Sequence, residues 1–110
     1  MNGAIEQRAM NLLSMAARGR RIVSGAFMAE DALKRKQGTF LLLAQDASEE
    51  TKTKFIRMAA QLKVPMAELL TMQQLGHCLG KEYRAVAVLI DRGFADRLSA
   101  YLQDIPTGVD

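Results

Sequence analysis

The stretch Phe40-Leu41-Leu42-Leu43-Ala44 is a continuous apolar run that follows Gly38 and precedes Asp46. It is too short for a typical helix and lies between two segments of helical periodicity, so it predicts a strand buried on both faces. A second continuous run, residues 85–90, predicts another such strand. Strands of this kind are typical of a sheet that helices cover on both sides.

Segments of helical and strand periodicity alternate on either side of these two runs. The apolar spacing predicts helices over residues 4–17, 25–36, 46–63, 71–80 and 94–102, and the third of these begins with a capping pattern at residues 46–49. Short strands are predicted over residues 21–24 and 65–70. The resulting order, α-β-α-β-α-β-α-β-α, predicts an α/β fold: a three-layer α/β/α sandwich with a mixed, mostly parallel four-stranded sheet. The length of 110 residues fits a single domain, with residues 105–110 as a flexible tail.

The amino-acid composition suggests a cellular compartment and the charge of a binding partner. The single cysteine rules out an intramolecular disulfide and fits a reducing cytoplasm, and neither a signal peptide nor a membrane-spanning run is visible. The formal net charge is +3, but residues 1–38 hold seven Lys and Arg against three Asp and Glu. This asymmetry suggests an anionic partner, although a solvated basic face explains it equally well.

Catalytic and metal-binding patterns are weak. His77 and Cys78 are neighbours, so on a helix they point about 100° apart and do not reach one ion. Cys78 is therefore interpreted as a small buried hydrophobe. Asp46 and Asp91 follow apolar strands, where catalytic carboxylates often lie, but each also precedes a helix that it is suited to cap. We expect no enzyme, no metal and no cofactor.

Basic clusters are the remaining candidates for function. They comprise Arg18, Arg20 and Arg21; Lys34, Arg35 and Lys36; and Lys81 with Arg84. The Ser24-Gly25 turn opens the second helix, and a turn that presents backbone N–H groups beside cations suits a polyanion. The topology allows this turn and the loop 80–84 to meet at one end of the sheet. Phe27 and Tyr83 are the only aromatic candidates for base stacking there.

Blocks of sequence from Leu12 to about Leu102 resemble the ribosomal L-seven-Ae/L-thirty-e family, most closely its small bacterial YlxQ-like branch. The order and spacing of the blocks carry the resemblance. The blocks are Leu12-Leu13-Ser14-Met15-Ala16-Ala17-Arg18, Ile22-Val23-Ser24-Gly25, residues 42–48, residues 51–55, Val64-Pro65, residues 75–88 and residues 91–95.

The resemblance implies an α/β/α sandwich that binds structured RNA, typically kink-turns. In the family, a Gly-x-Asn-Glu-x-x-Lys motif at the start of the second helix reads sheared G·A pairs, and the loop before the last strand covers a flipped-out nucleotide. Here the glycine is Gly25, but the Asn, Glu and Lys positions hold Phe27, Met28 and Asp31. Two apolar side chains and a reversed charge do not make the family's base contacts.

We therefore expect a non-enzymatic, cytoplasmic RNA-binding protein, with ribosomal RNA among its candidate partners and weakened kink-turn specificity. The expected RNA contacts come from Arg20 and Arg21 to phosphate, from the backbone at Ser24 and Gly25, from Phe27 and Met28 at the reading positions, and from flanking charge at Lys34, Lys81 and Arg84. The rival hypothesis is a protein-interaction module on the same fold. It rests on Phe27 and Met28, which helical spacing places outside the buried stripe of their helix.

Overall fold

The structure is a computed structural model that describes residues 3–103, and the predicted tail, 105–110, lies outside them. Helices and strands alternate throughout this part of the chain, as expected from the sequence. The elements are α1 (Gly3–Arg18), β1 (Ile22–Ser24), α2 (Ala26–Lys34), β2 (Phe40–Leu43), α3 (Glu49–Leu62), β3 (Met66–Glu68), α4 (Met72–Cys78), β4 (Val86–Leu89) and α5 (Arg92–Gln103). No helix within residues 3–103 has the length and apolar character needed to cross a membrane.

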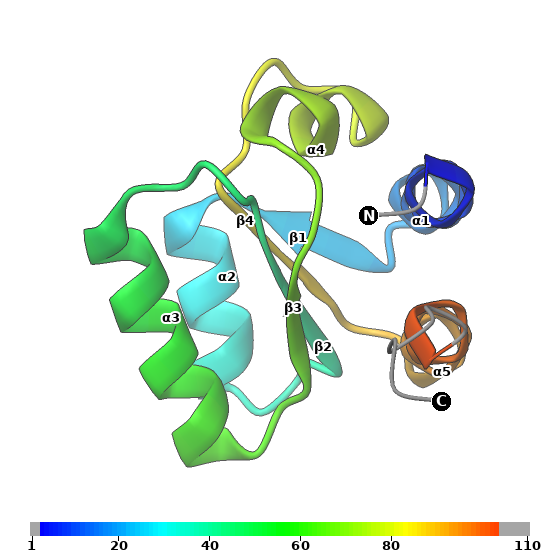
Figure 1. The fold of residues 1–110 in the computed structure, drawn as a ribbon. Helices are drawn as coiled ribbons and strands as arrows, with labels where there is room; N and C mark the ends of the chain where they lie inside the picture. The colour runs from blue at the N-terminus through cyan, green and yellow to red at the C-terminus, as the bar shows by residue number, and fades with distance from the viewer. Residues whose placement is uncertain (1–2, 104–110) are drawn as a thin grey trace, which may run out of the picture.

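The predicted three-layer sandwich is confirmed: α2 and α3 cover one face of the sheet, and α1, α4 and α5 lie on the other (Figure 1). Side chains alternate along β2, because successive residues of a strand point to opposite faces. Leu41 and Leu43 pack with the core residues of α2 and α3. Phe40 and Leu42 pack with those of α1, α4 and α5. All four are buried, which explains why β2 reads as a continuous apolar run.

The sheet is mixed, as predicted, but the expectation of a mostly parallel sheet is wrong for its pairings. The strand order is β1-β4-β2-β3, and of these neighbours β2 and β3 pair in parallel, whereas β4 pairs antiparallel with both β1 and β2. Three strands therefore run in one direction. The fourth, β4, is inserted between β1 and β2 in the opposite direction, and this insertion makes both of its pairings antiparallel.

The cap of α3 also differs from expectation. The sequence pattern assigned it to Asp46, but the cap is Ser48, whose hydroxyl accepts from the Thr51 N–H at 3.1 Å. Asp46 instead accepts from the N–H of Met72 at 2.8 Å, at the start of α4. A carboxylate at that position stabilises the positive end of the α4 dipole. Asp46 thus links the end of β2 to a helix that follows much later in the chain.

The strand directions sort the connecting segments into two groups at opposite ends of the sheet. One end, called here the Gly25 end, holds the β1–α2 turn and the loop between α4 and β4. The other, the basal end, holds the start of β1, the segments 35–39 and 63–65 that lead into β2 and β3, and the turn between β4 and α5. This division decides which of the predicted site residues lie together.

Candidate nucleic-acid interface

The turn at Gly25 holds the start of α2 open to solvent. Gly25 is the N-cap, with φ 92° and ψ 153°, a backbone conformation that is strongly unfavourable for residues other than glycine. Its N–H donates to the Val86 carbonyl at 3.0 Å, and its own carbonyl accepts from the Ala29 N–H at 2.9 Å. No described side chain caps this helix. The N–H groups of the first turn therefore remain available at the positive end of the helix dipole, which favours anions.

Arg84 joins this turn to the loop between α4 and β4, as the sequence predicted that the two segments would meet. Its Nε donates to the Ser24 hydroxyl at 3.1 Å, and its Nη1 donates to the Tyr83 carbonyl at 2.8 Å. A Cβ added at Gly25 would lie 4.0 Å from the same Nε. The guanidinium is therefore held beside the uncapped start of α2, where its remaining donors suit a phosphate.

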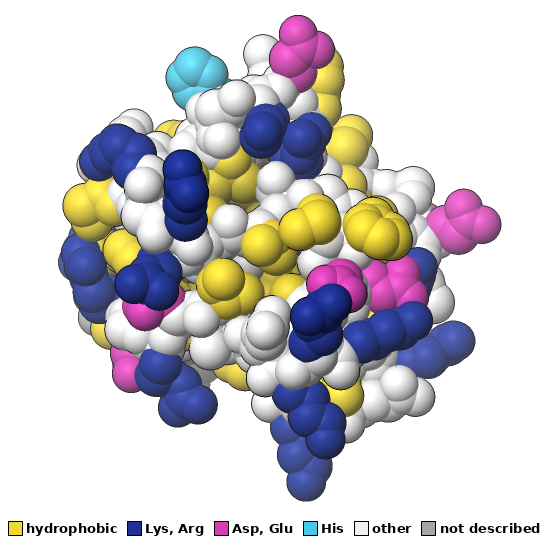
Figure 2. Space-filling view, turned by 180° about the vertical axis from the view of Figure 1, so that it is seen from behind, with side chains coloured by type: hydrophobic (Ala, Val, Ile, Leu, Met, Phe, Trp, Pro, Cys, Tyr) yellow, Lys and Arg dark blue, Asp and Glu magenta, His cyan; other side chains and the backbone are white. Residues whose placement is uncertain are grey.

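Exposed apolar side chains lie at the same end of the sheet as the Arg84 guanidinium. Phe27 is 81% exposed and Met28 is 47% exposed, both in the first turn of α2, and Tyr83 is 61% exposed. The view from behind faces the β1 edge of the sheet, and hydrophobic side chains cross its middle with Lys and Arg above and below (Figure 2). Several exposed apolar side chains gathered at one end of the sheet are typical of a binding surface. We call Ser24, Gly25, Phe27, Met28, Lys81, Tyr83 and Arg84 together the Gly25 surface.

Two further charged residues bear on this surface: Lys81, which belongs to it, and Asp31, which lies further along α2. Lys81 is exposed in the loop before β4, on the same side of the sheet as Arg84. Asp31, which occupies the family's lysine position, forms an ion pair with Arg35 at 3.2 Å. The reversed charge is therefore partly neutralised within α2.

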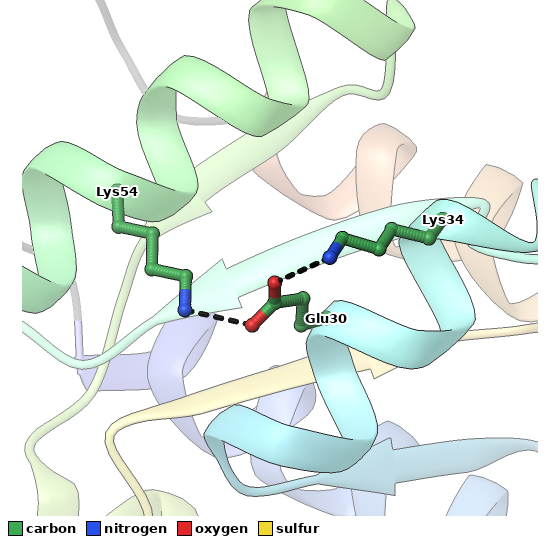
Figure 3. A network of polar contacts seen from close by, with 3 residues as sticks. All are labelled: Glu30, Lys34 and Lys54. Atoms are coloured by element: carbon green, nitrogen blue, oxygen red, sulfur yellow. Dashed lines mark hydrogen bonds and ion pairs between the residues drawn. The ribbon is translucent and has the colours of Figure 1, made fainter.

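Lys34 lies away from Gly25, at the other end of α2 and about 13.5 Å along the helix axis. It forms an ion pair with Glu30 at 2.9 Å, and Lys54 of α3 contacts the second oxygen of the same carboxylate at 2.7 Å (Figure 3). The hydrogen bonds from Lys54 and Lys34 lower the pKa of Glu30 to about 2. The same contact with Glu30 raises the pKa of Lys34. Glu30 thus joins α2 to α3 through Lys54, while Lys34 pairs with Glu30 within α2.

Arg20 and Arg21 are also separate from the Gly25 surface. Both are exposed and precede β1, and the Arg21 carbonyl accepts from the Ile90 N–H at 2.9 Å. This contact places them at the basal end, one strand length from Ser24. Of the predicted RNA-contacting residues, the structure brings together Ser24, Gly25, Phe27, Met28, Lys81 and Arg84. It does not bring Arg20, Arg21 and Lys34 to them.

Residues with catalytic potential have structural roles here. The Asp91 carboxylate accepts from the Phe94 N–H at 3.0 Å and caps α5. Burial raises the pKa of Cys78 to about 11, and its thiol donates to the Leu75 carbonyl. Within residues 3–103, no group of three or more His, Cys, Asp and Glu residues is placed to hold a metal. The interpretation of Asp91 as a helix cap is correct, whereas Asp46 does not cap α3 and instead accepts from the first N–H of α4, whose N-cap is Thr71.

Gly76 allows the loop before β4 to pack closely against α4. A Cβ added there would lie 2.6 Å from the Glu82 carbonyl oxygen and 2.8 Å from the Tyr83 nitrogen. The Lys81 N–H also donates to the Gly76 carbonyl at 2.8 Å. Gly76 therefore lets the loop that carries Arg84 rest directly on α4. The Gly76-x-x-x-Gly80 spacing was the available signal.

Comparison with known proteins places this geometry in a family. The chain is 34% identical over 91 residues to the RNA-binding protein YlxQ of Bacillus subtilis strain 168, covering 83% of this chain and 91% of that protein. It is 29% identical over 103 residues to the RNA-binding protein YlxQ of Enterococcus faecium, covering 94% of this chain and 99% of that protein. These relatives match the YlxQ-like branch that the sequence resembles.

Solved structures agree with the fold. A protein of unknown function from Bacillus halodurans superposes with a TM-score of 0.83 at 30% identity, over 87% of this chain and 97% of that one. The 15.5kD RNA binding protein of Giardia lamblia superposes with a TM-score of 0.77 at 19% identity, over 92% of each chain. A family model matches residues 7–98. The chain belongs to the Ribosomal protein L7Ae/L30e/S12e/Gadd45 family.

Proposed function

We propose that this chain binds structured RNA, without catalysis, through the Gly25 surface. The observation that carries the proposal is the placement of Arg84, whose guanidinium is held by Ser24 beside the uncapped start of α2. Backbone N–H groups and a fixed arginine are the donors that phosphate contacts use. The names of the YlxQ relatives support RNA as the partner. Ribosomal RNA in the cytoplasm is the source that we favour.

The same surface argues for weakened kink-turn specificity. Phe27 and Met28 have no groups that hydrogen-bond to guanine edges, and Asp31 is paired with Arg35. Each good bidentate base contact gives about 1–3 kcal/mol of discrimination, so a protein without them distinguishes sequences poorly. Contacts from Arg84, Lys81 and the α2 N–H groups to phosphate remain, and these depend on salt rather than on sequence.

A titration series tests the proposal. A kink-turn RNA and a plain RNA duplex are titrated with the wild type, R84Q and the control R57Q across a range of salt concentrations. Arg57 is exposed on α3, away from the Gly25 surface. We expect the wild type to bind both RNAs with similar affinity. In R84Q the affinity falls for both, and the salt slope decreases by roughly one. R57Q should match the wild type. Undetectable or salt-independent binding to both RNAs would contradict the proposal.

The exposure of Phe27 favours one second candidate, a protein-interaction module that uses Phe27 and Met28. A phenyl ring 81% exposed in a regular helix has no packing role within the described residues. Light scattering of the wild type against F27D measures self-association, and a pull-down compares bound proteins. The control is I56D, which changes an exposed residue of α3. An unchanged mass together with an unchanged set of captured proteins in F27D would remove this candidate.

A further inference from the structure

A second cationic surface lies at the basal end, away from the Gly25 surface. An open groove of about 560 Å³ separates the last residues of α2 and α3 from one face of α5. That face presents Arg92, Asp96 and Ser99, which helical spacing places on one side of α5. Lys36 and Lys63 stand on the opposite wall. We call this feature the basal groove.

The cations of the basal groove differ from their neighbours in being unpaired. Within residues 3–103, no ion pair joins Lys36, Lys63 or Arg92 to an acidic group, and all three are exposed. Nearby Lys34 and Lys54, by contrast, share the Glu30 carboxylate. The groove therefore gathers three cations that form no ion pair within the described residues, together with one carboxylate, Asp96.

Helix dipoles account for two of these cations but not for the third. Lys36 and Lys63 follow the ends of α2 and α3, where the negative end of each dipole attracts a cation. Arg92, however, is the first residue of α5, where the dipole disfavours a positive charge. Both lysines also adopt left-handed backbone angles, with φ of 61° and 58°, at helix ends where glycine is the usual residue. Helix stability alone therefore does not explain why Arg92 begins α5 or why lysine occupies the two left-handed positions.

The strand order places a cation near the basal end of every strand. Arg21 leads into β1, Arg92 follows β4, and Lys36 and Lys63 precede β2 and β3. Because the order is β1-β4-β2-β3 and neighbouring strands lie about 4.8 Å apart, the row spans roughly 14 Å. Lys and Arg side chains are visible along this lower end of the molecule (Figure 2).

The floor of the groove is fixed by hydrogen bonds. The Thr39 hydroxyl lies 3.0 Å from the Leu89 carbonyl and 3.1 Å from that of Asp91, tying the start of β2 to the β4–α5 turn. The Lys63 N–H donates to carbonyls of the last turn of α3. The backbone that carries the three cations is therefore held in place before any ligand arrives.

We propose that the basal groove is a second site for the phosphodiester backbone of RNA, so that the protein contacts RNA at both ends of its sheet. This inference rests on the proposed function. The three cations of the groove lie beside three neighbouring strands, β4, β2 and β3, which span roughly 10 Å, and a row of that length suits a chain of phosphates better than a single phosphate ion. Asp96 opposes the bound anion, and its removal should strengthen binding.

The test compares charge removal at the groove with equal removal elsewhere. The groove variant is K36N/K63N/R92Q, in which Asn tolerates the left-handed conformation of both lysines. The matched control is R8Q/R57Q/R97Q, which removes the same charge from α1, α3 and α5. Both are titrated with a long plain RNA duplex across salt concentrations, and their folding is verified by thermal denaturation. D96N forms a separate arm, and inorganic phosphate is titrated against the amide NMR signals of Thr39 and Ser99.

We expect the groove variant to lose a salt-dependent part of its affinity that the control keeps. Three phosphate contacts correspond to a slope of about 2.7, so a fourfold rise in salt should weaken wild-type binding roughly 40-fold more than it weakens the groove variant. D96N should bind more tightly than the wild type. The Thr39 and Ser99 signals should shift with RNA and little with inorganic phosphate.

The outcomes separate the two proposals. If the groove variant binds like its control while R84Q is impaired, the groove proposal is overturned and the Gly25 surface stands. If the wild type binds neither RNA, both are overturned. Saturable shifts with inorganic phosphate and none with RNA would reassign the groove to a small anion and overturn its role in RNA binding.

Discussion

Replacing Gly76 by alanine perturbs the loop that carries Arg84. The added Cβ would lie 2.6 Å from the Glu82 carbonyl oxygen, whereas ordinary contact begins near 3.4 Å. The loop must therefore retreat by about 0.8 Å, because the contacting atoms are backbone and cannot rotate away. Overpacking of this kind costs about 1–3 kcal/mol, and the better helix propensity of alanine offsets up to about 1 kcal/mol. We expect a net loss of roughly 1–2 kcal/mol in the free energy of unfolding.

The same displacement should weaken RNA binding, because the 3.1 Å hydrogen bond from Arg84 to Ser24 does not survive a shift of that size. Thermal denaturation followed by circular dichroism should show a melting temperature lower by roughly 4–8 °C. The RNA titration should show an affinity close to that of R84Q. The matched control is G80N. A Cβ at Gly80 meets nothing within 4 Å, and asparagine tolerates its φ of 75°.

This reasoning would be refuted if G76A behaved like an ordinary substitution on a helix surface. If G76A melts at or above the wild-type temperature and binds RNA normally, the loop does not rest on Gly76. If G80N is as unstable as G76A, the effect arises from any change in this segment rather than from the contact. Urea denaturation gives the free energy independently, and its midpoint should move in the same direction as the melting temperature.

Three further predictions concern single residues. G25A should cost about 1–3 kcal/mol in urea denaturation, because φ 92° and ψ 153° lie in a region that is nearly exclusive to glycine; an unchanged midpoint would contradict this. Because the folded pKa of Glu30 is about 2 and its ordinary value is 4.5, the stability it contributes is present above pH 4.5 and lost as the pH falls toward 2. The difference in urea midpoint between wild type and E30Q should shrink over that interval, and a constant difference would count against the ion pairs. Partial burial raises the pKa of Cys78 from 9.0 to about 11, so at pH 8 the native thiol is ionised roughly a hundredfold less than the urea-unfolded one, and iodoacetamide should alkylate it roughly tenfold more slowly; equal rates would show that the fold does not shield the thiol.

Local periodicity was sufficient to predict the elements and the layers of this fold. Residues 40–44 and 85–90 read as continuous apolar runs because both faces of β2 and β4 are covered by helices. Thr71 and Gln74 have the spacing of a capping box, and both of its hydrogen bonds are present at the start of α4. These patterns can be recognised in the sequence because each involves residues that are only a few positions apart.

Strand direction and long-range contacts were not predictable in the same way. The antiparallel insertion of β4 depends on which gap in the sheet its side chains fill, and no local pattern records that choice. The bond from Asp46 to Met72 joins residues 26 positions apart, so Asp46 appeared to be a cap for the nearer helix. Arg20 and Arg21 were grouped with Gly25 because they are close in sequence, although a strand separates them in space.

The direction of β4 also decides how charge is distributed between the two ends of the sheet. Because β4 runs opposite to its neighbours, the loop that precedes it joins the segment that follows β1, and this brings Arg84 to Ser24. The turn that follows β4 joins the segments that precede β2 and β3, and this brings Arg92 to the side of Lys36 and Lys63. A parallel β4 would exchange the two sets and leave each end with an incomplete group of cations. The antiparallel strand β4 is therefore the element that assembles both proposed contact surfaces.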